Sequence, residues 1–491
     1  MGRLKMRSDK ARNHYDIPRA ATVRRASRTL LSAIMKTKGE QMKTSIKSKL
    51  FAGFLALAAT AAVAQEDPAS PILFTNVNVF DGKNKALIED ANIVVTGNLI
   101  TAISTEPLAV AGGRVIDGGG RMLIPGLTDS HTHIVWNDNI EKLIYSAPEG
   151  YVGVLAAKNA REMLLRGFTT VRDLGGPAHG LAQAIDAGIV DGPRIFPTGA
   201  FLSQSSGHGD FDPRLYYLSP HFTGQIDKAY LRGWTIIADG VPEVQKASRE
   251  ILRAGATQIK IMGSGSITGA HDPLDVTEYT LEELKAIVKE ADNWGTYATI
   301  HAYSSESIMN AIEAGVQSVE HALFASEKAM KLMKKKDVFF STQFLSYSLT
   351  PEEAGMTGPA VPKYLEAQAG AESGYKAAKK VGVKMTWGTD ILGSLDLARL
   401  QSQEFVARSK YFSGYEILKQ ATSNNAELFA RSGLRSPYQD GPLGVIEEGA
   451  YADILLVNGN PLEDITLLAD PEKNLALIMK DGVIYKNTLE N

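Results

Sequence analysis

The sequence contains no cysteine among its 491 residues. This absence excludes a disulfide-stapled fold, a thiolate-ligated zinc site, an iron–sulfur cluster, a cysteine nucleophile and a lipid anchor on cysteine. Any metal site must therefore be built from nitrogen and oxygen ligands. Nine histidines are present to supply the nitrogen.

Long apolar runs are also absent. The longest, Leu50–Ala62, is too short to span a bilayer. Three lysines precede it at positions 43, 47 and 49, and the small-x-small pattern Ala62-Val63-Ala64 follows it. This order predicts a secretory signal peptide over residues 42–64, with cleavage before Gln65, and a secreted or periplasmic protein without a stable membrane anchor. An uncleaved anchor or a buried helix are the alternatives.

A basic surface is missing from the remainder of the chain. Residues 1–64 hold 14 of the 52 lysines and arginines but only three acids, which leaves 38 basic and 52 acidic residues beyond them. With this excess of acidic residues, the rest of the chain is a poor candidate for binding anionic membranes, and we expect no nucleic-acid partner. Residues 1–41 lack apolar periodicity, and we expect a disordered leader or an over-extended choice of start codon.

Both ends of the mature chain indicate strands. Residues 65–124 contain short alternating runs such as Ile72–Val77 and Leu99–Ile103, separated by turn residues. Similar runs return in residues 441–491, for example Ala452–Val457 and Leu475–Met479. We expect the two ends to pair into one small β-sandwich domain.

Residues 125–440 alternate between short apolar runs and helical patterns, such as Leu281–Ala291 and Ser305–Ala314. This rhythm predicts an α/β fold of the (β/α)8 TIM-barrel type, with a doubly wound sheet as the alternative. The eight expected strands are Met122–Thr128, Thr169–Leu174, Arg194–Thr198, Gln258–Met262, Tyr297–His301, Ser318–His321, Val338–Thr342 and Lys384–Trp387.

Metal-ligand residue types lie at the ends of these expected strands, where barrel enzymes place their sites. His131 and His133 are two apart, so on a strand they face the same side. Lys260 lies inside an apolar strand, where an unpaired ammonium would be costly. Three further residues of this kind are His301, His321 and Asp390. Each alone is more often a structural residue.

Together these motifs resemble the amidohydrolase superfamily of binuclear metal-dependent hydrolases, over residues 72–485. The resemblance rests on Ile124-Pro125-Gly126-Leu127 with H-x-H, the Lys260 strand, Val319-Glu320-His321, Gly388-Thr389-Asp390, and the C-terminal motifs that begin at Ala421 and Leu443. Within that superfamily the chain is most similar to the secreted branch of Xaa-Pro and Xaa-Arg dipeptidases and ochratoxin-degrading amidohydrolases.

The resemblance implies two divalent metal ions and carboxylation of Lys260, so that the lysine bridges both. His131, His133 and Asp390 would hold one ion, and His301 and His321 the other. A hydroxide between the metals would attack the substrate, and Asp390 would move its proton to the leaving amine. Zinc is the default metal for such ligands, with manganese or cobalt as alternatives. A homo-oligomer is also implied.

Two further residues are expected to touch the substrate. Tyr303 lies two places after His301, where relatives that act on cyclic amides carry a second histidine; its phenol could donate to a developing oxyanion. His208 lies between two glycines in the loop after the third strand, which faces the barrel mouth. Their alternatives are an aromatic packing residue and a solvated loop histidine.

The predicted protein is therefore a secreted, metal-dependent amidohydrolase that cleaves small-molecule amides, either dipeptides or N-acyl amino acids, including ochratoxin-type amides. The alternatives are a lactonase or phosphotriesterase on the same site and a metal-binding relative without catalysis. We expect Arg172 and Asp173, after the second strand, to form an ion pair that braces the barrel.

Overall fold

The computed structural model of the chain describes residues 70–212, 218–269 and 272–489. The expected leader (1–41) and signal peptide (42–64) lie outside the described residues. Within the described part, no helix is both long and apolar enough to cross a membrane.

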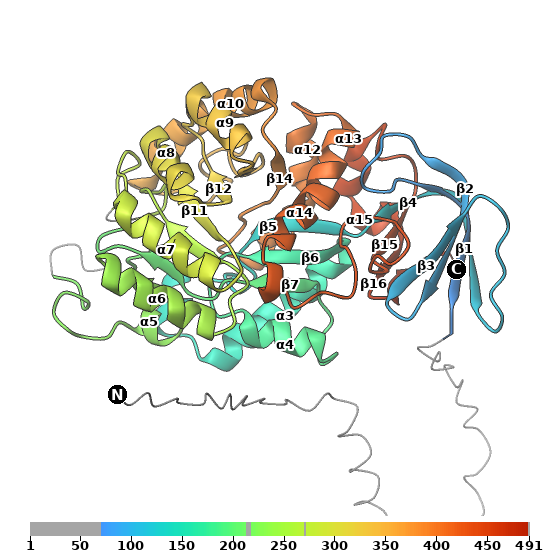
Figure 1. Cartoon of the computed structure of the whole chain (residues 1–491), viewed down its shortest axis with the longest axis horizontal. Coiled ribbons are helices and arrows are strands. Elements are labelled where there is room, and N and C mark those ends of the chain that lie inside the picture. The colour runs from blue at the N-terminus through green and yellow to red at the C-terminus, as the bar shows by residue number, and fades with distance from the viewer. Residues whose placement is uncertain (1–69, 213–217, 270–271, 490–491) are drawn as a thin grey trace, which may run out of the picture. The chain divides into compact units, whose positions relative to one another are not determined.

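Strands from both ends of the chain form one seven-stranded sheet, as Figure 1 shows. The antiparallel pairing of β4 with β15 joins the two ends, with Leu123 opposite Leu456. The pairing of the two ends is thus confirmed, and their strands belong to one hydrogen-bonded sheet. In spatial order they are β17 (Val483–Asn487), β16 (Leu475–Lys480), β15 (Ile454–Val457), β4 (Arg114–Pro125), β1 (Ile72–Val79), β2 (Ile88–Thr96) and β3 (Leu99–Ser104).

The middle of the chain forms parallel strands in two sheets, and nearly every residue in them is buried. Burial on both faces explains their continuous apolar character. The first sheet contains β5 (Leu127–Thr132), β6 (Phe168–Asp173) and β7 (Arg194–Pro197). The second has the order β14 (Met385–Trp387), β13 (Phe339–Thr342), β12 (Ser318–His321), β11 (Ala298–Ala302), β10 (Ile259–Met262), β8 (Phe201–Ser203) and β9 (Thr235–Ile237).

Hydrogen bonds also connect the two parallel sheets to each other. On one side, the Thr257 N–H donates to the Pro197 carbonyl at 2.9 Å, which ties the chain before β10 to β7. On the other side, the Asn425 amide donates to the carbonyls of Thr128 and Trp387 at 3.0 and 2.8 Å, which ties β5 to β14. These hydrogen bonds tie one parallel sheet to the other at two places.

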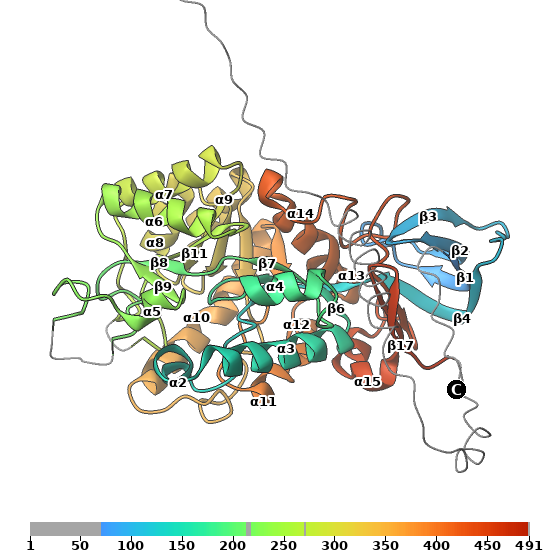
Figure 2. The ribbon, with the colours of Figure 1, turned by 90° about the horizontal axis from the view of Figure 1, so that it is seen from below.

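Helices cover the outside of these strands, as both views show (Figure 1, Figure 2). Their sequences explain their bounds: α7 begins with a capping box between Thr280 and Glu283, and α8 ends at Gly315 in a left-handed conformation. The longer helices are α3 (Glu149–Leu165), α4 (His179–Asp186), α6 (Val241–Arg253), α7 (Leu281–Asn293), α8 (Ser305–Ala314), α9 (Glu327–Lys335) and α10 (Ala360–Val381).

Short helices fill the connections and the C-terminal third. The π-helix η3 (Gln420–Asn424) is continuous with α13 and α14 and carries the Ala421 motif. The short helices are α2 (Ile140–Tyr145), α5 (Lys228–Leu231), α11 (Leu395–Ala398), η2 (Gln401–Gln403), α12 (Glu404–Ser409), α13 (Gly414–Lys419), α14 (Asn425–Ala430), η4 (Gly433–Arg435), η5 (Ile465–Ala469) and α15 (Pro471–Asn474).

The expected first barrel strand, Met122–Thr128, is wrong. The structure divides this run at Gly126: Met122–Pro125 end β4 in the end sheet, and β5 begins at Leu127. A side chain at Gly126 would lie 2.2 Å from the Thr169 hydroxyl, so only glycine allows the chain to pass here. The continuous apolar run 122–128 therefore contributes residues to two different sheets.

Candidate metal centre and active site

The two histidines of the H-x-H motif lie at the end of β5. They face the same side because strand residues alternate, and both are buried, with 1% and 8% of their surface exposed for His131 and His133. Their ring centroids are 5.4 Å apart. The Asp129 carboxylate, two residues before His131, accepts a hydrogen bond from the His131 N–H at 3.0 Å and so fixes the start of the motif.

Asp390 joins these histidines from the loop after β14. Its backbone is left-handed, with φ of 53°, and its N–H donates to the His131 carbonyl at 2.8 Å. A side chain at the preceding Gly388 would lie 2.9 Å from the Cβ of His131, so glycine permits this approach. Left-handed non-glycine residues are uncommon and concentrate at functional sites.

The Asp390 carboxylate could share one metal ion with both histidines. Its Oδ1 lies 3.2 Å from His131 Nε2 and 3.1 Å from His133 Nε2, and the three ligand atoms lie within 4.8 Å of one another. Ligands about 2.1 Å from a tetrahedral zinc ion are about 3.4 Å apart, so the spacing fits. Burial would raise the pKa of Asp390, but the histidines around it hold that pKa well below the ordinary value.

His301 and His321 lie beside this group, at the ends of β11 and β12. Their ring centroids are 4.5 Å apart, and the His321 ring is 5.1 Å from that of His131. Glu320 and His321 are adjacent in β12, so in a regular strand their side chains would point to opposite sides. Because Glu320 points into the interior, His321 would then point outward. The left-handed backbone of His321, with φ of 69°, instead brings both side chains to the same site.

Hydrogen bonds determine which imidazole nitrogen is free to bind metal. Carboxylate, amide and carbonyl oxygens only accept hydrogen bonds, so an imidazole nitrogen that faces one of these oxygens carries the hydrogen. His131 Nδ1 faces Glu320 Oε2 at 2.9 Å, and His321 Nδ1 faces Gln343 Oε1 at 2.8 Å. His301 instead directs Nε2 to the Gly265 carbonyl at 3.3 Å. The free nitrogens are therefore Nε2 of His131 and His321 and Nδ1 of His301.

Lys260 is fully enclosed in β10, with 1% of its surface exposed. It pairs in register with Thr299 of β11, which lies on the same side of the strand as His301. Burial lowers the pKa of Lys260 to about 8, against the attraction of Glu320 and Asp390. A lysine with a depressed pKa is more often neutral near pH 8, and a neutral amine is the form that can be carboxylated.

Glu320 is a residue that the sequence analysis treated only as part of a motif. It is completely buried, pairs with Arg172 at 2.8 Å and accepts hydrogen bonds from Ser318 and Thr299. Burial opposes its charge, yet Arg172 and His131 hold its pKa well below the ordinary value. Such a carboxylate behind a ligand histidine orients the ring and increases its basicity.

The expected ion pair between Arg172 and Asp173 is wrong. The Arg172 guanidinium turns into the interior, to Glu320 and the Ser130 carbonyl. Asp173 accepts hydrogen bonds from the N–H groups of Ile134 and Gly175 instead. Adjacent strand residues point to opposite faces, which is why the two cannot pair.

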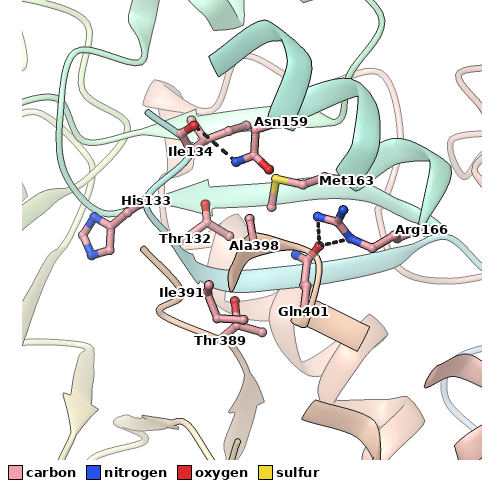
Figure 3. Close-up of a pocket in the computed structure, with 10 residues that line it drawn as sticks. All are labelled: Thr132, His133, Ile134, Asn159, Met163, Arg166, Thr389, Ile391, Ala398 and Gln401. Atoms are coloured by element: carbon pink, nitrogen blue, oxygen red, sulfur yellow. Dashed lines mark hydrogen bonds between the residues drawn. The ribbon is translucent and has the colours of Figure 1, made fainter. Parts of the chain in front are cut away.

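A chain of polar side chains supports Asp129 from behind. Gln401 donates to Asp129 Oδ2 at 3.0 Å and accepts two hydrogen bonds from Arg166, and Thr389 donates to the same oxygen at 2.7 Å. Arg166 and Gln401 line a small cavity of about 10 Å³. In Figure 3 the His133 ring points away from the other labelled side chains. The cavity is too small for a substrate, so these residues position the motif and do not bind ligand there.

His208 lies against His301, with ring centroids 4.6 Å apart in a stacked arrangement. Its N–H donates to Glu278 Oε1 at 2.8 Å, and its Nδ1 is 3.4 Å from Asp272 Oδ2. A side chain at Gly207 would lie 2.3 Å from Glu278 Oε2, so glycine is required beside it. No sequence pattern indicated that Asp272 and Glu278, which are buried in the loop after β10, would hold this histidine.

Tyr303 also reaches this group. Its ring centroid is 4.7 Å from that of His301 and 5.1 Å from that of His321. Its hydroxyl is 3.3 Å from the hydroxyl of Tyr347, a residue that the sequence analysis missed. Only the loop position after β13 could have pointed to Tyr347. All eight predicted site residues thus converge at the carboxyl ends of the parallel strands.

A larger groove, of about 260 Å³, lies elsewhere, beside β9 and α6. His221 and Glu243 line it, and with Asp239 they form a second, exposed group of residue types that bind metals. None of the eight predicted site residues lines this groove.

Comparison with known proteins agrees with this geometry. The model of the amidohydrolase family matches residues 122–485. Ochratoxinase from Aspergillus niger is 32% identical over 379 residues, which cover 74% of this chain and 76% of the relative.

Two crystal structures cover 85% of this chain and the whole of theirs. One is a prolidase complexed with N-methylphosphonate-L-proline, at 34% identity and a TM-score of 0.78. The other is an Xaa-Pro dipeptidase with bound methionine in its active site, at 28% identity and a TM-score of 0.74. With a family match across three quarters of its length and these ligand-type residues gathered at the strand ends, the chain belongs to the amidohydrolase family.

Proposed function

We propose that this amidohydrolase-family enzyme hydrolyses the amide bond of small molecules that carry an amino acid, namely dipeptides or N-acyl amino acids. The observation that carries the proposal is the convergence of His131, His133 and Asp390 with the His301–His321 pair at one buried site. The similarity to a prolidase, an Xaa-Pro dipeptidase and an ochratoxinase supports this substrate class.

Two divalent metal ions fit the donor set, and zinc is the metal we expect. His131, His133 and Asp390 would hold one ion, His301 and His321 the other, and Lys260 would bridge them as a carbamate. The fit rests on the three ligand atoms around Asp390 Oδ1 and on the ring nitrogens left free by Glu320, Gln343 and Gly265. When bound, the ions would supply Lewis acidity that activates water and polarises a carbonyl.

Asp390 is the residue that would move the proton. Its Oδ1 faces the two histidines of β5, while Oδ2 lies 3.9 Å from His321 Nδ1 and is less engaged. Its low pKa keeps it ionised, so it can accept a proton from the attacking water. The same carboxylate would then deliver that proton to the nitrogen of the leaving amine. The proton is needed because the carbon–nitrogen bond of the substrate cannot break to release an amide anion.

Tyr303 and His208 would contact the substrate. Both rings lie beside that of His301, with centroids 4.6 Å away for His208 and 4.7 Å away for Tyr303. Burial raises the pKa of Tyr303 far above neutrality, so it keeps its hydrogen and acts as a donor. A donor aimed at an oxygen that becomes negative lowers the barrier more than it tightens substrate binding.

We further infer that the two parallel sheets close into one (β/α)8 barrel, supported by the hydrogen bonds that tie β7 to the chain before β10 and β5 to β14. Export is a separate proposal, supported by the pattern of residues 42–64. The intact mass of protein recovered from outside its native cells would test it. Cleavage before Gln65 is refuted if active, exported protein retains residues 1–64, and export is refuted if the protein is recovered only from inside the cells.

The hydrolytic proposal is tested with purified, metal-loaded protein and a panel of Xaa-Pro, Xaa-Arg and Xaa-Phe dipeptides and N-acyl amino acids. A lactone and a phosphotriester complete the panel. We expect the turnover of the amides to exceed the turnover of the lactone and of the phosphotriester. We also expect amide turnover to depend on a free carboxylate in the substrate. Turnover of only the lactone or phosphotriester would replace the proposal by the alternative, and no turnover with full metal content would indicate a relative without catalysis.

A further inference from the structure

The hydroxyl of Tyr347 lies at the candidate active site but has no role in the proposed mechanism. Tyr347 lies in the loop after β13, half-buried, and its hydroxyl is 3.3 Å from that of Tyr303 and 3.5 Å from His321 Nδ1. A hydroxyl has one hydrogen to donate, so its two neighbours compete for it. Which neighbour receives that hydrogen determines where the hydrogen of Tyr303 points.

His321 Nδ1 cannot be the acceptor. It lies 2.8 Å from Gln343 Oε1, an amide oxygen that only accepts, so Nδ1 already carries a hydrogen. Within the described residues, the hydroxyl oxygen of Tyr303 is then the one acceptor left for the hydrogen of Tyr347. Tyr303 in turn has its own hydrogen free to donate, and the residues around it leave the substrate as the recipient.

The loop that carries Tyr347 is held firmly enough to make this arrangement specific. Helix α10 fixes it through Gln368, whose amide donates to the carbonyls of Tyr347 and Leu349 at 3.2 and 2.6 Å. From α12, Glu404 accepts the N–H groups of Phe344 and Leu345. Because the backbone of this loop is hydrogen-bonded to α10 and to α12, the loop can hold the Tyr347 side chain in one orientation.

We propose that Tyr347 is a positioning residue, which donates its hydroxyl hydrogen to Tyr303 and thereby aims the Tyr303 hydroxyl at the negatively charged oxygen of the substrate. This inference rests on the proposed function, because it assigns a partner to the donor used there. It also makes Tyr303 a stronger donor, since a hydroxyl that accepts one hydrogen bond is polarised to donate another.

A double-mutant cycle in the metal-loaded enzyme tests the proposal, with Tyr347→Phe, Tyr303→Phe and both together. Loss of one hydrogen bond predicts that Tyr347→Phe lowers kcat/KM roughly tenfold, mostly through kcat. Tyr303→Phe should cost on the order of a hundredfold. Because Tyr347 acts through Tyr303, the double variant should be no slower than Tyr303→Phe alone.

The matched control is Tyr364→Phe. The Tyr364 hydroxyl lies within hydrogen-bond distance of the carbonyls of Ser346 and Leu349 in the same loop, and none of its hydrogen bonds involves Tyr303. Any effect of Tyr364→Phe should therefore multiply with that of Tyr303→Phe. The same result for Tyr347→Phe would show that Tyr347 serves only the loop, and would overturn the proposal.

A second readout does not depend on turnover. A phosphonate analogue of the tetrahedral intermediate should bind about tenfold more weakly to Tyr347→Phe than to the wild type, and equally to Tyr303→Phe and the double variant. Unchanged inhibition constants for Tyr347→Phe would also overturn the proposal. Turnover of the dipeptide panel by the wild type tests the proposed function by itself, so the two failures are distinguishable.

Discussion

Lys260 is the residue whose position most requires a chemical explanation. An ammonium enclosed among apolar neighbours costs several kcal/mol unless it is paired, and Ile259 and Ile261 flank it in its own strand. Glu320 and Asp390 attract it, yet Glu320 is already shared by Arg172 and His131. A carbamate removes this conflict, because it replaces the buried cation by an anion that two metal ions can stabilise.

Lys260→Ala should therefore lose metal and activity together. Added acetate or formate should restore part of both, because a small carboxylate can enter the cavity that alanine leaves. Lys260→Arg should not be rescued, since guanidinium stays cationic. The measurement is metal content by elemental analysis, alongside turnover with and without acetate.

Lys480→Ala is the matched control, because Lys480 is also buried, at 5% exposure, but lies in the end sheet. We expect the Lys480→Ala variant to keep its metal. Two metals and a full rate in Lys260→Ala without acetate would show that Lys260 is merely structural.

Asp390 is the second residue that can be tested singly. Asparagine keeps an oxygen that can face the metal but cannot accept the proton, so Asp390→Asn should retain most of its metal and lose turnover. Loss of a general base costs roughly a hundred- to ten-thousand-fold. Metal content and kcat are measured on the same sample. Near-normal turnover at full occupancy would remove Asp390 from proton transfer.

At the scale of elements, loops and not strands orient His208 and Tyr303, the two groups proposed to contact the substrate. The loop after β10 contributes Asp272 and Glu278 to His208, while the loop after β13 contributes Tyr347 to Tyr303. Lys363 of α10 donates to the carbonyls of Ser266, Gly269 and Asp272, so the same helix holds both loops. We expect substitutions on this face of α10 to alter kcat without removing metal.

Glu278 gives the fold a pH dependence. Burial raises its pKa from 4.5 to about 8, so the folded chain binds a proton here that the unfolded chain releases between these values. Each pH unit in that interval therefore costs the fold about 1.4 kcal/mol per proton. This loss of stability is complete once the pH passes the folded pKa.

Glu278→Gln should remove that loss, because glutamine keeps an oxygen that can accept the His208 N–H. The variant should unfold at nearly the wild-type temperature at pH 5 and at a higher temperature at pH 8. Thermal unfolding at both pH values checks this. Glu282→Gln, an exposed carboxylate on the adjacent helix α7, should shift neither value; an equal gain at both pH values for Glu278→Gln would contradict the assignment.

At the scale of the whole molecule, the candidate metal centre joins strands from both parallel sheets. His131 and His133 come from β5, whereas His301 and His321 come from β11 and β12. Ions bound by residues from both sheets stabilise the folded chain, by about 4 kcal/mol when free metal exceeds its Kd a thousandfold.

Removal of metal with a chelator should therefore lower the unfolding temperature as well as abolish turnover, and added zinc should restore both. Differential scanning calorimetry before and after dialysis provides the measurement. His221→Ala, in the exposed group beside α6, serves as a control that should change neither result. An unchanged unfolding temperature after complete metal loss would mean that the ions do not connect the sheets.

The sequence alone determined the features that depend on neighbours along the chain. Strand alternation placed His131 and His133 on one side. The order of apolar runs located β6, β10, β11, β12 and β14 closely enough to put Lys260 inside a strand, His301 near the end of one and Asp390 in the loop after one. The pairing of the two ends into one sheet also followed from their similar patterns.

Only the tertiary structure decided the features that depend on residues far apart. The division of the first run at Gly126, the partner of Arg172, the left-handed turn of His321 and the contact of Tyr347 with Tyr303 each rely on a neighbour from another strand or loop. Periodicity describes which face of an element a residue occupies, but not which buried group it meets there. That choice belongs to the packing of the whole chain, because a buried polar atom takes whichever partner the fold brings within hydrogen-bond distance.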